Sequence, residues 1–325
     1  MSKAFTAIFY FDEPEAFLGA LEKIARDKML ITSAQFSMED RYQEAMEGGQ
    51  YKNLSFILVR EAELQALVLA HKVGKTLRYN HLGISITSLA EDKKIISSAI
   101  EWIIEAAKKN NISEILVDDK GSGNELSLIG AEAFNYKGTP QTKLEAIIDL
   151  GQSEKEIHRQ IRKSYKSLVN QGRKEMRFEY VAGDKAERHL FDDFQNFHRQ
   201  VAGRATRSQE TWDLQYDMIV TGQAELVLGY LEPHGLISSA LFNDVGDMTV
   251  YSVAVYNRDL FDYPLAHANV YEGIMRAKER GQKLFYLGQI PAYGSVEEKE
   301  FNIGKFKKGF CDRLKSYIEW HIKVE

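Results

Sequence analysis

The sequence predicts a layered α/β or α+β fold built from two copies of one arrangement of strands and helices. Strand-like runs alternate with amphipathic helical runs along the chain, which is typical of layered folds rather than of bundles or sandwiches. Part of the pattern occurs twice: three strands, a helix and a further strand appear in each half, over about 60 residues each. Because there are only two copies, we expect two tandem domains and not a solenoid.

Length and composition agree with two globular domains. The chain has 325 residues, of which 44% are hydrophobic and 27% charged, so it can bury a large core and is not disordered. Its net charge of −5 argues against a coat of positive charge for non-specific nucleic-acid binding, so any anion site must be local. The single cysteine, Cys311, excludes an intramolecular disulfide and is interpreted as a packing residue. The histidines show no metal-ligand spacing, and we predict no metal.

The first copy is expected in a domain comprising residues 1–152. The domain opens with a strand at residues 6–11, an apolar run that is too short to span a membrane and is followed by acidic residues. We therefore expect a cytoplasmic protein. The repeated elements follow as three strands, a helix and a strand, at residues 54–61, 64–73, 76–84, 91–111 and 113–119.

A basic connecting helix is predicted at residues 153–175. Its start is a capping box, Ser153 with Glu156, and its end lies near Gly172. One face is apolar and the other basic; the apolar residues are Ile157, Ile161, Tyr165 and Leu168, and the basic residues are Arg159, Arg162, Lys163 and Lys166. Two interpretations stay open, a linker helix with solvated charges and a face that binds phosphate, in which Arg162 and Lys163 would contact the substrate.

The second copy is expected in a domain comprising residues 176–325. Its elements follow the order of the first copy, at residues 224–232, 235–243, 247–256, 264–280 and 283–288. Five short motifs accompany the two copies in a fixed order: "IRKSYKSLVNQG" between the halves, then "FHRQVAGRATRS", "VYSVAVY", "KLFYLGQ" and "FKKGF".

These motifs and the tandem layout make the chain similar to a known family. A three-strand meander, a helix and a further strand form the core of the GNAT acyltransferase fold. Two such units in tandem resemble the FemAB family of peptidoglycan aminoacyl transferases and its BioF2-like acetyltransferase relatives. The resemblance covers nearly the whole chain. It implies that the first domain is a degenerate copy and that the second domain carries the transferase centre.

The resemblance also implies a reaction. The protein would move an aminoacyl or acetyl group onto an amine of a phosphorylated cell-envelope or surface-polysaccharide precursor. No cofactor would be tightly bound, and the donor would be either acetyl-CoA (or another acyl-CoA) or aminoacyl-tRNA. Two departures leave the donor open: residues 257–264, "NRDLFDYP", lack the glycines that hold the CoA pyrophosphate, and no long helical hairpin follows "GRATRS". The alternative is an inactive tandem module that binds an anionic sugar or RNA.

Lys307 is the main catalytic candidate, because it matches the lysine of the family's FK-x-GF motif. Acyl transfer to an amine passes through a tetrahedral oxyanion, which an ammonium group can stabilise. Without the resemblance, Lys307 would be interpreted as a surface lysine between the packing residues Phe306 and Phe310. Its neighbours Lys305 and Lys308 must point in other directions in any regular conformation.

The remaining candidates lie elsewhere in the second domain. His198 is a candidate general base or a structural residue, and Arg204 and Arg207 are candidates to clamp a phosphate or carboxylate of the acceptor, or ordinary surface arginines. Tyr251 and Tyr256 are five residues apart on one strand, which predicts opposite faces, with one of them lining the site. The last candidate, Gln289 at the end of a strand, would orient the acceptor.

Overall fold

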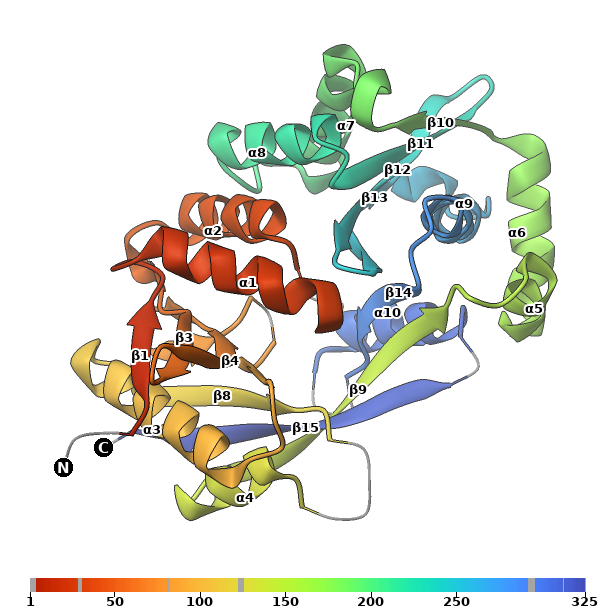
Figure 1. Ribbon diagram of the computed structural model, residues 1–325. Coiled ribbons are helices and arrows are strands. Elements are labelled where there is room, and N and C mark those ends of the chain that lie inside the picture. The colour runs from red at the N-terminus through yellow and green to blue at the C-terminus, as the bar shows by residue number, and fades with distance from the viewer. Residues whose placement is uncertain are drawn as a thin grey trace. The chain divides into compact units, whose positions relative to one another are not determined.

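The computed structural model describes residues 4–28, 31–80, 82–121, 126–291, 296–311 and 313–324 (Figure 1). The chain forms two compact units: unit 1 comprises Met1–Lys143 with Ser316–Glu325, and unit 2 comprises Leu144–Lys315. The α/β fold class predicted from the sequence is confirmed. The units differ from the predicted domains: residues 144–152 and the basic segment 153–175 lie within unit 2, and the last ten residues belong to unit 1.

Unit 1 contains a four-stranded sheet in the order β1-β3-β4-β7. The strands are β1 (Thr6–Phe9), β3 (Phe56–Arg60), β4 (Glu63–Leu69) and β7 (Ser85–Ser88). Helix α1 (Pro14–Lys28) packs on one face, and α3 (Lys93–Lys109), which Asp92 caps, packs on the other. Along β3 and β4, alternate side chains point to opposite faces of the sheet, and both faces are buried.

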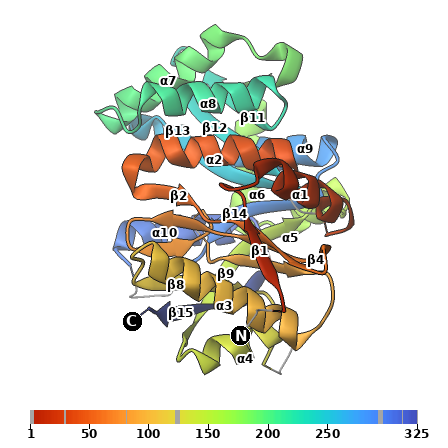
Figure 2. The same cartoon turned by 60° about the vertical axis from the view of Figure 1, so that its left-hand side comes forward.

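A second set of strands in unit 1 surrounds β8 (Glu114–Asp119). The C-terminal strand β15 (Leu314–Lys323) pairs antiparallel with β8, and β6 (Thr76–Arg78) pairs with it in parallel. Strands β5 (His71–Val73) and β2 (Tyr51–Asn53) follow beyond β6. Helices α2 (Ser33–Glu47) and α4 (Leu128–Asn135) complete the unit, in which α2 contacts β2 and α4 contacts α3 (Figure 2).

Two strands predicted in unit 1 are each broken in the structure. The run 64–73 divides into β4 and β5 at Ala70, whose N–H donates to the Ser55 hydroxyl instead of continuing the ladder. The run 76–84 stops at Arg78, because Asn80 adopts a left-handed conformation with φ of 54°. Predicting either strand as continuous was wrong, since side-chain and turn contacts override the local preference for extended backbone.

Unit 2 contains the strand order β10-β11-β12-β13-β14-β9, to which β9 contributes residues 144–149. The bounds are β9 (Thr139–Asp149), β10 (Arg177–Val181), β11 (Ala224–Leu231), β12 (Gly235–Val245), β13 (Met248–Tyr256) and β14 (Leu284–Gln289). All neighbouring pairs are antiparallel except β13 with β14. The four strands predicted for the second copy are thus confirmed within three residues at each end.

Helices cover both faces of β11–β13. Helix α9 (Leu265–Glu279) packs on one face, where Phe242 of β12 lies against Gly273, and α7 (Arg188–Ala202) and α8 (Gln209–Val220) lie on the other (Figure 1). Helix α10 (Glu298–Lys308) contacts β14. Cys311 is buried in the core that includes Phe242, Phe285 and Tyr271. Among the described residues, no helix is both long enough and apolar enough to cross a bilayer.

The basic segment forms two helices and not the single predicted one. The capping box of Ser153 and Glu156 is confirmed at the start of α5 (Glu154–Gln160), and α6 (Lys163–Glu175) begins after an extended Ile161. The break exists because the Arg162 N–H donates to the carbonyl oxygen of Gly309 at 2.8 Å. Gly172 does not end a helix; it lies within α6, where a Cβ would come within 2.5 Å of the Ala268 Cβ on α9.

Candidate functional site

The candidate site is the place where strands β13 and β14 of unit 2 separate. Their parallel ladder extends only from Met248 opposite Leu284 to Val250 opposite Tyr286. Each strand continues along its other neighbour, β13 along β12 as far as Tyr256 and β14 along β9 as far as Gln289. From residues 251 and 287 onward, the described parts of the two strands therefore have facing edges that make no ladder with each other. Such an opening can receive an extended acyl chain or peptide by backbone hydrogen bonds.

Lys307 lies beside this opening. A Cβ on Gly288 of β14 would be 2.4 Å from Lys307 Nζ, and Gly288 has φ of 112°, a conformation that favours glycine. The side chain is half-buried, and within the described part of the chain no carboxylate or hydrogen-bond partner of its ammonium group is found; burial alone shifts its pKa. Burial lowers the pKa of Lys307 from its ordinary value. A desolvated cation without a counter-ion can bind an anion or stabilise a developing oxyanion.

The other two lysines of the motif lie on the outside. Lys305 is exposed and its Nζ lies 4.6 Å from the centre of the Phe301 ring, and Lys308 is exposed. Helical geometry on α10 separates them from Lys307, as the one- and two-residue spacings require. Of the three lysines, only Lys307 therefore lies where its side chain can take part in a reaction.

Aromatic packing fixes the segment that carries Lys307. Phe306 and Phe310 lie with ring centroids 5.2 Å apart, and Tyr165 of α6 contacts both of them. The Tyr165 ring lies directly over Gly309, where a Cβ would come within 2.1 Å of a ring atom. Any larger residue would push the two segments apart. The motifs "IRKSY" and "FKKGF" are thus parts of one contact.

His267, in the first turn of α9, belongs to the same cluster. Its ring centroid lies 4.3 Å from that of Tyr165 and 5.2 Å from that of Phe306. Burial lowers the pKa of His267 to about 4, so the ring is neutral at physiological pH. Sequence reasoning missed this residue, because a lone histidine in "PLAHANV" has no distinguishing spacing.

Tyr251 and Tyr256 share one face of β13, and the prediction of opposite faces was wrong. Their hydroxyl oxygens lie 2.8 Å apart. The reason is a β-bulge: Leu241 of β12 faces Val253, but the next residue, Phe242, faces Tyr251, so Ser252 is an extra residue that reverses the alternation. Burial raises the pKa of Tyr251 to about 12 and that of Tyr256 further, so both hydroxyls stay protonated.

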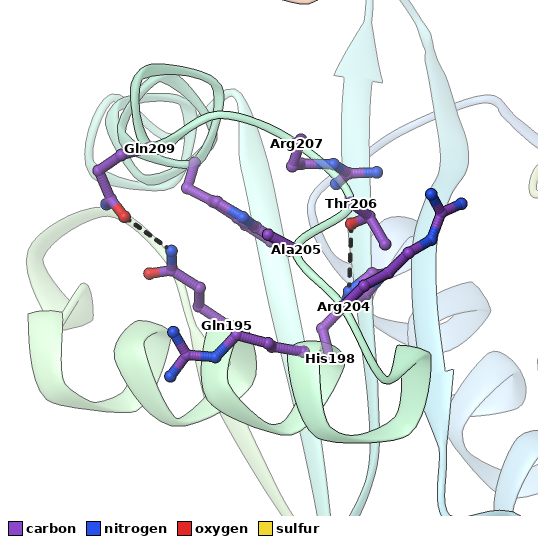
Figure 3. Close-up of a pocket in the computed structure, with 9 residues that line it drawn as sticks. Gln195, His198, Arg204, Ala205, Thr206, Arg207 and Gln209 are labelled. Atoms are coloured by element: carbon purple, nitrogen blue, oxygen red, sulfur yellow. Dashed lines mark hydrogen bonds between the residues drawn. The ribbon is translucent and has the colours of Figure 1, made fainter.

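A second cavity of about 170 Å³ lies between the end of α7 and the start of α8 (Figure 3). The predicted residues His198, Arg204 and Arg207 all line it, together with Arg199 and Trp212. Gly203 ends α7 in a left-handed conformation, and Ser208 caps α8, which together hold the short connecting loop in place. Helix α7 also packs against β13, the strand that borders the opening.

The electrostatics of this cavity favour an anion. No aspartate or glutamate is among its lining residues. The Arg207 guanidinium lies 4.8 Å from the Trp212 ring and donates to the Gln215 amide oxygen, but within the described residues its buried Nε has no partner. The Thr206 hydroxyl lies 3.5 Å from His198 Nδ1, and burial followed by the charge of Arg207 lowers the pKa of His198. A neutral histidine and the guanidinium groups of Arg204 and Arg207 suit a phosphate or carboxylate.

Two predicted binding residues, Arg162 and Lys163, lie outside these two places, whereas Gln289 lies on β14 at the edge of the opening. Arg162 and Lys163 are exposed at the start of α6; the Arg162 guanidinium lies 5.8 Å from the Tyr165 ring, while its backbone fixes Gly309. Gln289 is the last residue of β14, opposite Glu145 of β9. Their roles in binding stay predictions.

The loop that precedes α9 is unsuited to a pyrophosphate. Residues 257–264 carry Asp259 and Asp262 and no glycine, and the Asn257 side chain accepts the Asp259 N–H. The first turn of α9 is also covered by α6, because Gly172 lies against Ala268. Two carboxylates and a covered helix start oppose the usual binding of phosphate at a helix N-terminus.

Comparison with solved structures identifies the fold. FemX is similar over 87% of this chain and 90% of its own, with a TM-score of 0.65 and 12% identity. A tandem GNAT protein from the clavulanic acid biosynthesis pathway matches over 99% of both chains, with a TM-score of 0.59 and 9% identity. L-PGS from Bacillus licheniformis matches over 88% of this chain and 90% of its own, with a TM-score of 0.55 and 14% identity.

These likenesses confirm the predicted resemblance to FemAB-like tandem GNAT proteins as a likeness of fold. No family model and no curated protein matches the chain by sequence. At 9–14% identity the solved structures show a shared architecture and leave the choice of donor and acceptor to the chemistry of the site.

Proposed function

We propose that unit 2 transfers an aminoacyl or acyl group onto an amine of a phosphorylated cell-envelope or surface-polysaccharide precursor. The observation that carries this proposal is the position of Lys307, a desolvated ammonium group beside Gly288 where β13 and β14 separate. An acyl group held along the open strand edges would present its carbonyl oxygen to a cation. The names of FemX and of the tandem GNAT protein among the similar structures support this class of reaction.

In the proposed step, the acceptor amine attacks the carbonyl carbon of the donor ester or thioester. Lys307 donates to the oxygen of the tetrahedral intermediate and stabilises its negative charge, an effect worth about 100- to 1000-fold in rate at comparable sites. The C–N bond forms and the bond to the leaving oxygen or sulfur breaks. The amine gives up one proton to the hydrogen-bonded hydroxyls of Tyr251 and Tyr256, which would pass a proton on to the leaving atom and so end as they began.

The arginine cavity would hold the phosphate of the acceptor. Arg204 and Arg207 supply two guanidinium groups and the lining holds no carboxylate, so a phosphate would be bound without repulsion. His198 in the same lining would accept a hydrogen bond or a proton from the bound acceptor. Exposed Arg162 and Lys163 would contribute only weakly, because solvent screens them.

For the donor, we propose an aminoacyl-tRNA ester rather than acyl-CoA. The reason is the loop 257–264, which has two carboxylates and no glycine at the place where a GNAT domain receives the CoA pyrophosphate.

The direct test is a transfer assay with both donors. The purified chain would be incubated with a nucleotide-linked muropeptide or an amino sugar nucleotide, and with either radiolabelled aminoacyl-tRNA or labelled acetyl-CoA. We expect label to enter the acceptor from aminoacyl-tRNA. Transfer from acetyl-CoA alone would reverse the donor assignment. Without transfer from either donor, a steep fall of sugar or RNA affinity with salt would instead identify a binding module, the second function considered for this fold.

A further inference from the structure

Unit 1 contains a cavity that has no part in the proposed transfer reaction. Its volume is about 150 Å³, and it lies between the end of β1 and the C-terminal half of α3. Three aromatic residues and three charged residues dominate its lining, namely Phe9, Phe11, Trp102, Asp12, Glu105 and Lys109.

The aromatic rings form a corner with fixed walls. Phe9 lies 5.2 Å from Phe11 with the rings tilted by 31°, and 6.4 Å from Trp102 with the rings at 74°, measured between centroids. The Trp102 indole N–H donates to the Phe5 carbonyl oxygen at 3.3 Å, and Phe9 packs on buried Phe56. The walls are therefore held by the core of unit 1. Phe11 closes the corner from outside and is 48% exposed.

This geometry favours a compact group over a flat ring. A flat ring inserted between two others needs about 7 Å between their planes, twice the van der Waals separation. Phe9 lies 5.2 Å from Phe11 and 6.4 Å from Trp102, so no slot of that width exists between Phe9 and either of these rings. A ligand must instead lie in the corner, against ring faces.

The ring faces of the corner can bind a cation. The lining contains two carboxylates, Asp12 and Glu105, and one ammonium group, that of Lys109, which lies 2.8 Å from Glu105. The faces of aromatic rings attract cations, most strongly where water is excluded. An ammonium group of the chain itself uses one of these rings, since Lys52 Nζ lies 4.7 Å from the centre of Phe11 while bonded to the Asn110 side chain.

We propose that this corner of unit 1 binds a compact alkylammonium group of a small molecule, methylated or quaternary. The ring faces of Phe9, Phe11 and Trp102 contact the cation, and Asp12 in the same lining supplies a negative charge. All residues of the corner belong to unit 1, and none of them is part of the proposed transferase centre in unit 2. Its occupation does not depend on which acyl group unit 2 transfers.

Choline and its neutral isostere 3,3-dimethyl-1-butanol test the proposal, because the two molecules differ in charge and hardly in shape. The indole N–H signal of Trp102 would be assigned by comparison with a Trp102→Phe variant, and the other two of the 3 tryptophans serve as internal references. We expect choline to shift the Trp102 signal saturably, with an affinity at least about tenfold above that of the alcohol.

Variants complete the test. Phe11→Leu and Asp12→Asn should each weaken choline binding severalfold, while Phe261→Leu, which changes an exposed ring of unit 2, should leave it unchanged. An equal response to choline and to the alcohol, no response of Trp102 to either, or choline binding that survives both unit 1 substitutions would overturn the proposal.

Discussion

The two units follow the same order of elements but differ at their parallel strand pairs. These pairs are β6 with β8 in unit 1 and β13 with β14 in unit 2. In unit 2, the ladder between β13 and β14 ends after three residue pairs, and Lys307 lies at the opening. In unit 1, the ladder between β6 and β8 is interrupted and then resumes, because Ile84 bridges Val117 and the Gly83 N–H donates to Asp118 Oδ1 at 2.9 Å.

Under the proposed function, this difference distinguishes the unit that holds the reaction site from the unit that does not. A Cβ on Gly83 would lie 2.6 Å from the Asp118 backbone nitrogen, so glycine lets the chain close onto β8. The strand end in unit 1 carries the buried carboxylates of Asp118 and Asp119, where unit 2 has a lysine. Carboxylates would repel a developing oxyanion. The closed strands and the reversed charge both favour unit 2 as the transferase centre.

Apart from replacement of Lys307 itself, Gly288→Ala in unit 2 should have the largest effect on turnover. The new Cβ would lie 2.4 Å from Lys307 Nζ, and displacing the ammonium group by about 1 Å should cost roughly 100-fold in kcat. Gly281→Ala is the matched control: φ is 82° there, but nothing lies within 4 Å of the new Cβ. Both variants should lose stability through backbone strain, and steady-state kinetics should show that only Gly288→Ala loses turnover.

Gly83→Ala tests the closed strands of unit 1. Backbone atoms of Asp118 and Val117 lie within 2.9 Å of the new Cβ and cannot move aside cheaply, so we expect the free energy of unfolding to fall by about 1–3 kcal/mol. Denaturant titration measures this loss. Gly19→Ala in α1, with open space around it, should be neutral or slightly stabilising. Loss of turnover in folded Gly83→Ala would show that unit 1 takes part in the chemistry.

Arg207→Ala tests the arginine cavity as the acceptor's phosphate site. Losing one guanidinium fork from a phosphate site should raise KM for the acceptor about tenfold and leave kcat nearly unchanged. Arg177→Ala, at an exposed arginine paired with Glu179 on β10, is the control for removal of one positive charge. Equal KM values for the two variants would remove the cavity from the acceptor site.

The smallest effect concerns His267 and acid. The pKa of His267 is about 4 in the folded protein and near 6.5 when the chain is unfolded, so the unfolded state binds more protons between these values. The contribution of neutral His267 to stability is therefore complete above pH 6.5 and decreases as the pH falls toward 4. His267→Phe should flatten the pH dependence of unfolding across this window. An NMR titration giving His267 an ordinary pKa would contradict the packing described.

The sequence predicts the strands of unit 2 well, because alternating apolar residues and Gly turns determine them locally. It misses the break at Ile161, since the hydrogen bond from Arg162 to Gly309 joins residues far apart in the chain. It also misplaces Tyr256 relative to Tyr251, because nothing in "VYSVAVY" signals the bulge at Ser252.

The candidate site is only partly predictable for the same reason. Lys307 is found through its motif, and His198, Arg204 and Arg207 are close in sequence and line one cavity. The roles of Gly288 and His267 become visible only in the folded structure, where β14 and α9 each pack against α10. The sequence pattern places Tyr165 on an apolar helix face. The glycine of "FKKGF" signals that another group packs closely against that segment, and in the structure this group is the Tyr165 ring.

In the proposed function, the burial of the Lys307 ammonium group serves catalysis and does not stabilise the fold. Burial lowers the pKa of Lys307, which means that the charged ammonium group is less stable in the folded than in the unfolded chain. Lys307→Met should therefore raise the free energy of unfolding by about 1 kcal/mol.

The decisive measurement is single-turnover transfer together with thermal unfolding for Lys307→Met and Lys308→Met, which change neighbouring lysines of α10, one beside Gly288 and one exposed. We predict that Lys307→Met loses at least about 100-fold in rate and gains stability, while Lys308→Met changes neither. Equal rates for the two variants, or a Lys307→Met protein that loses stability along with activity, would contradict the account.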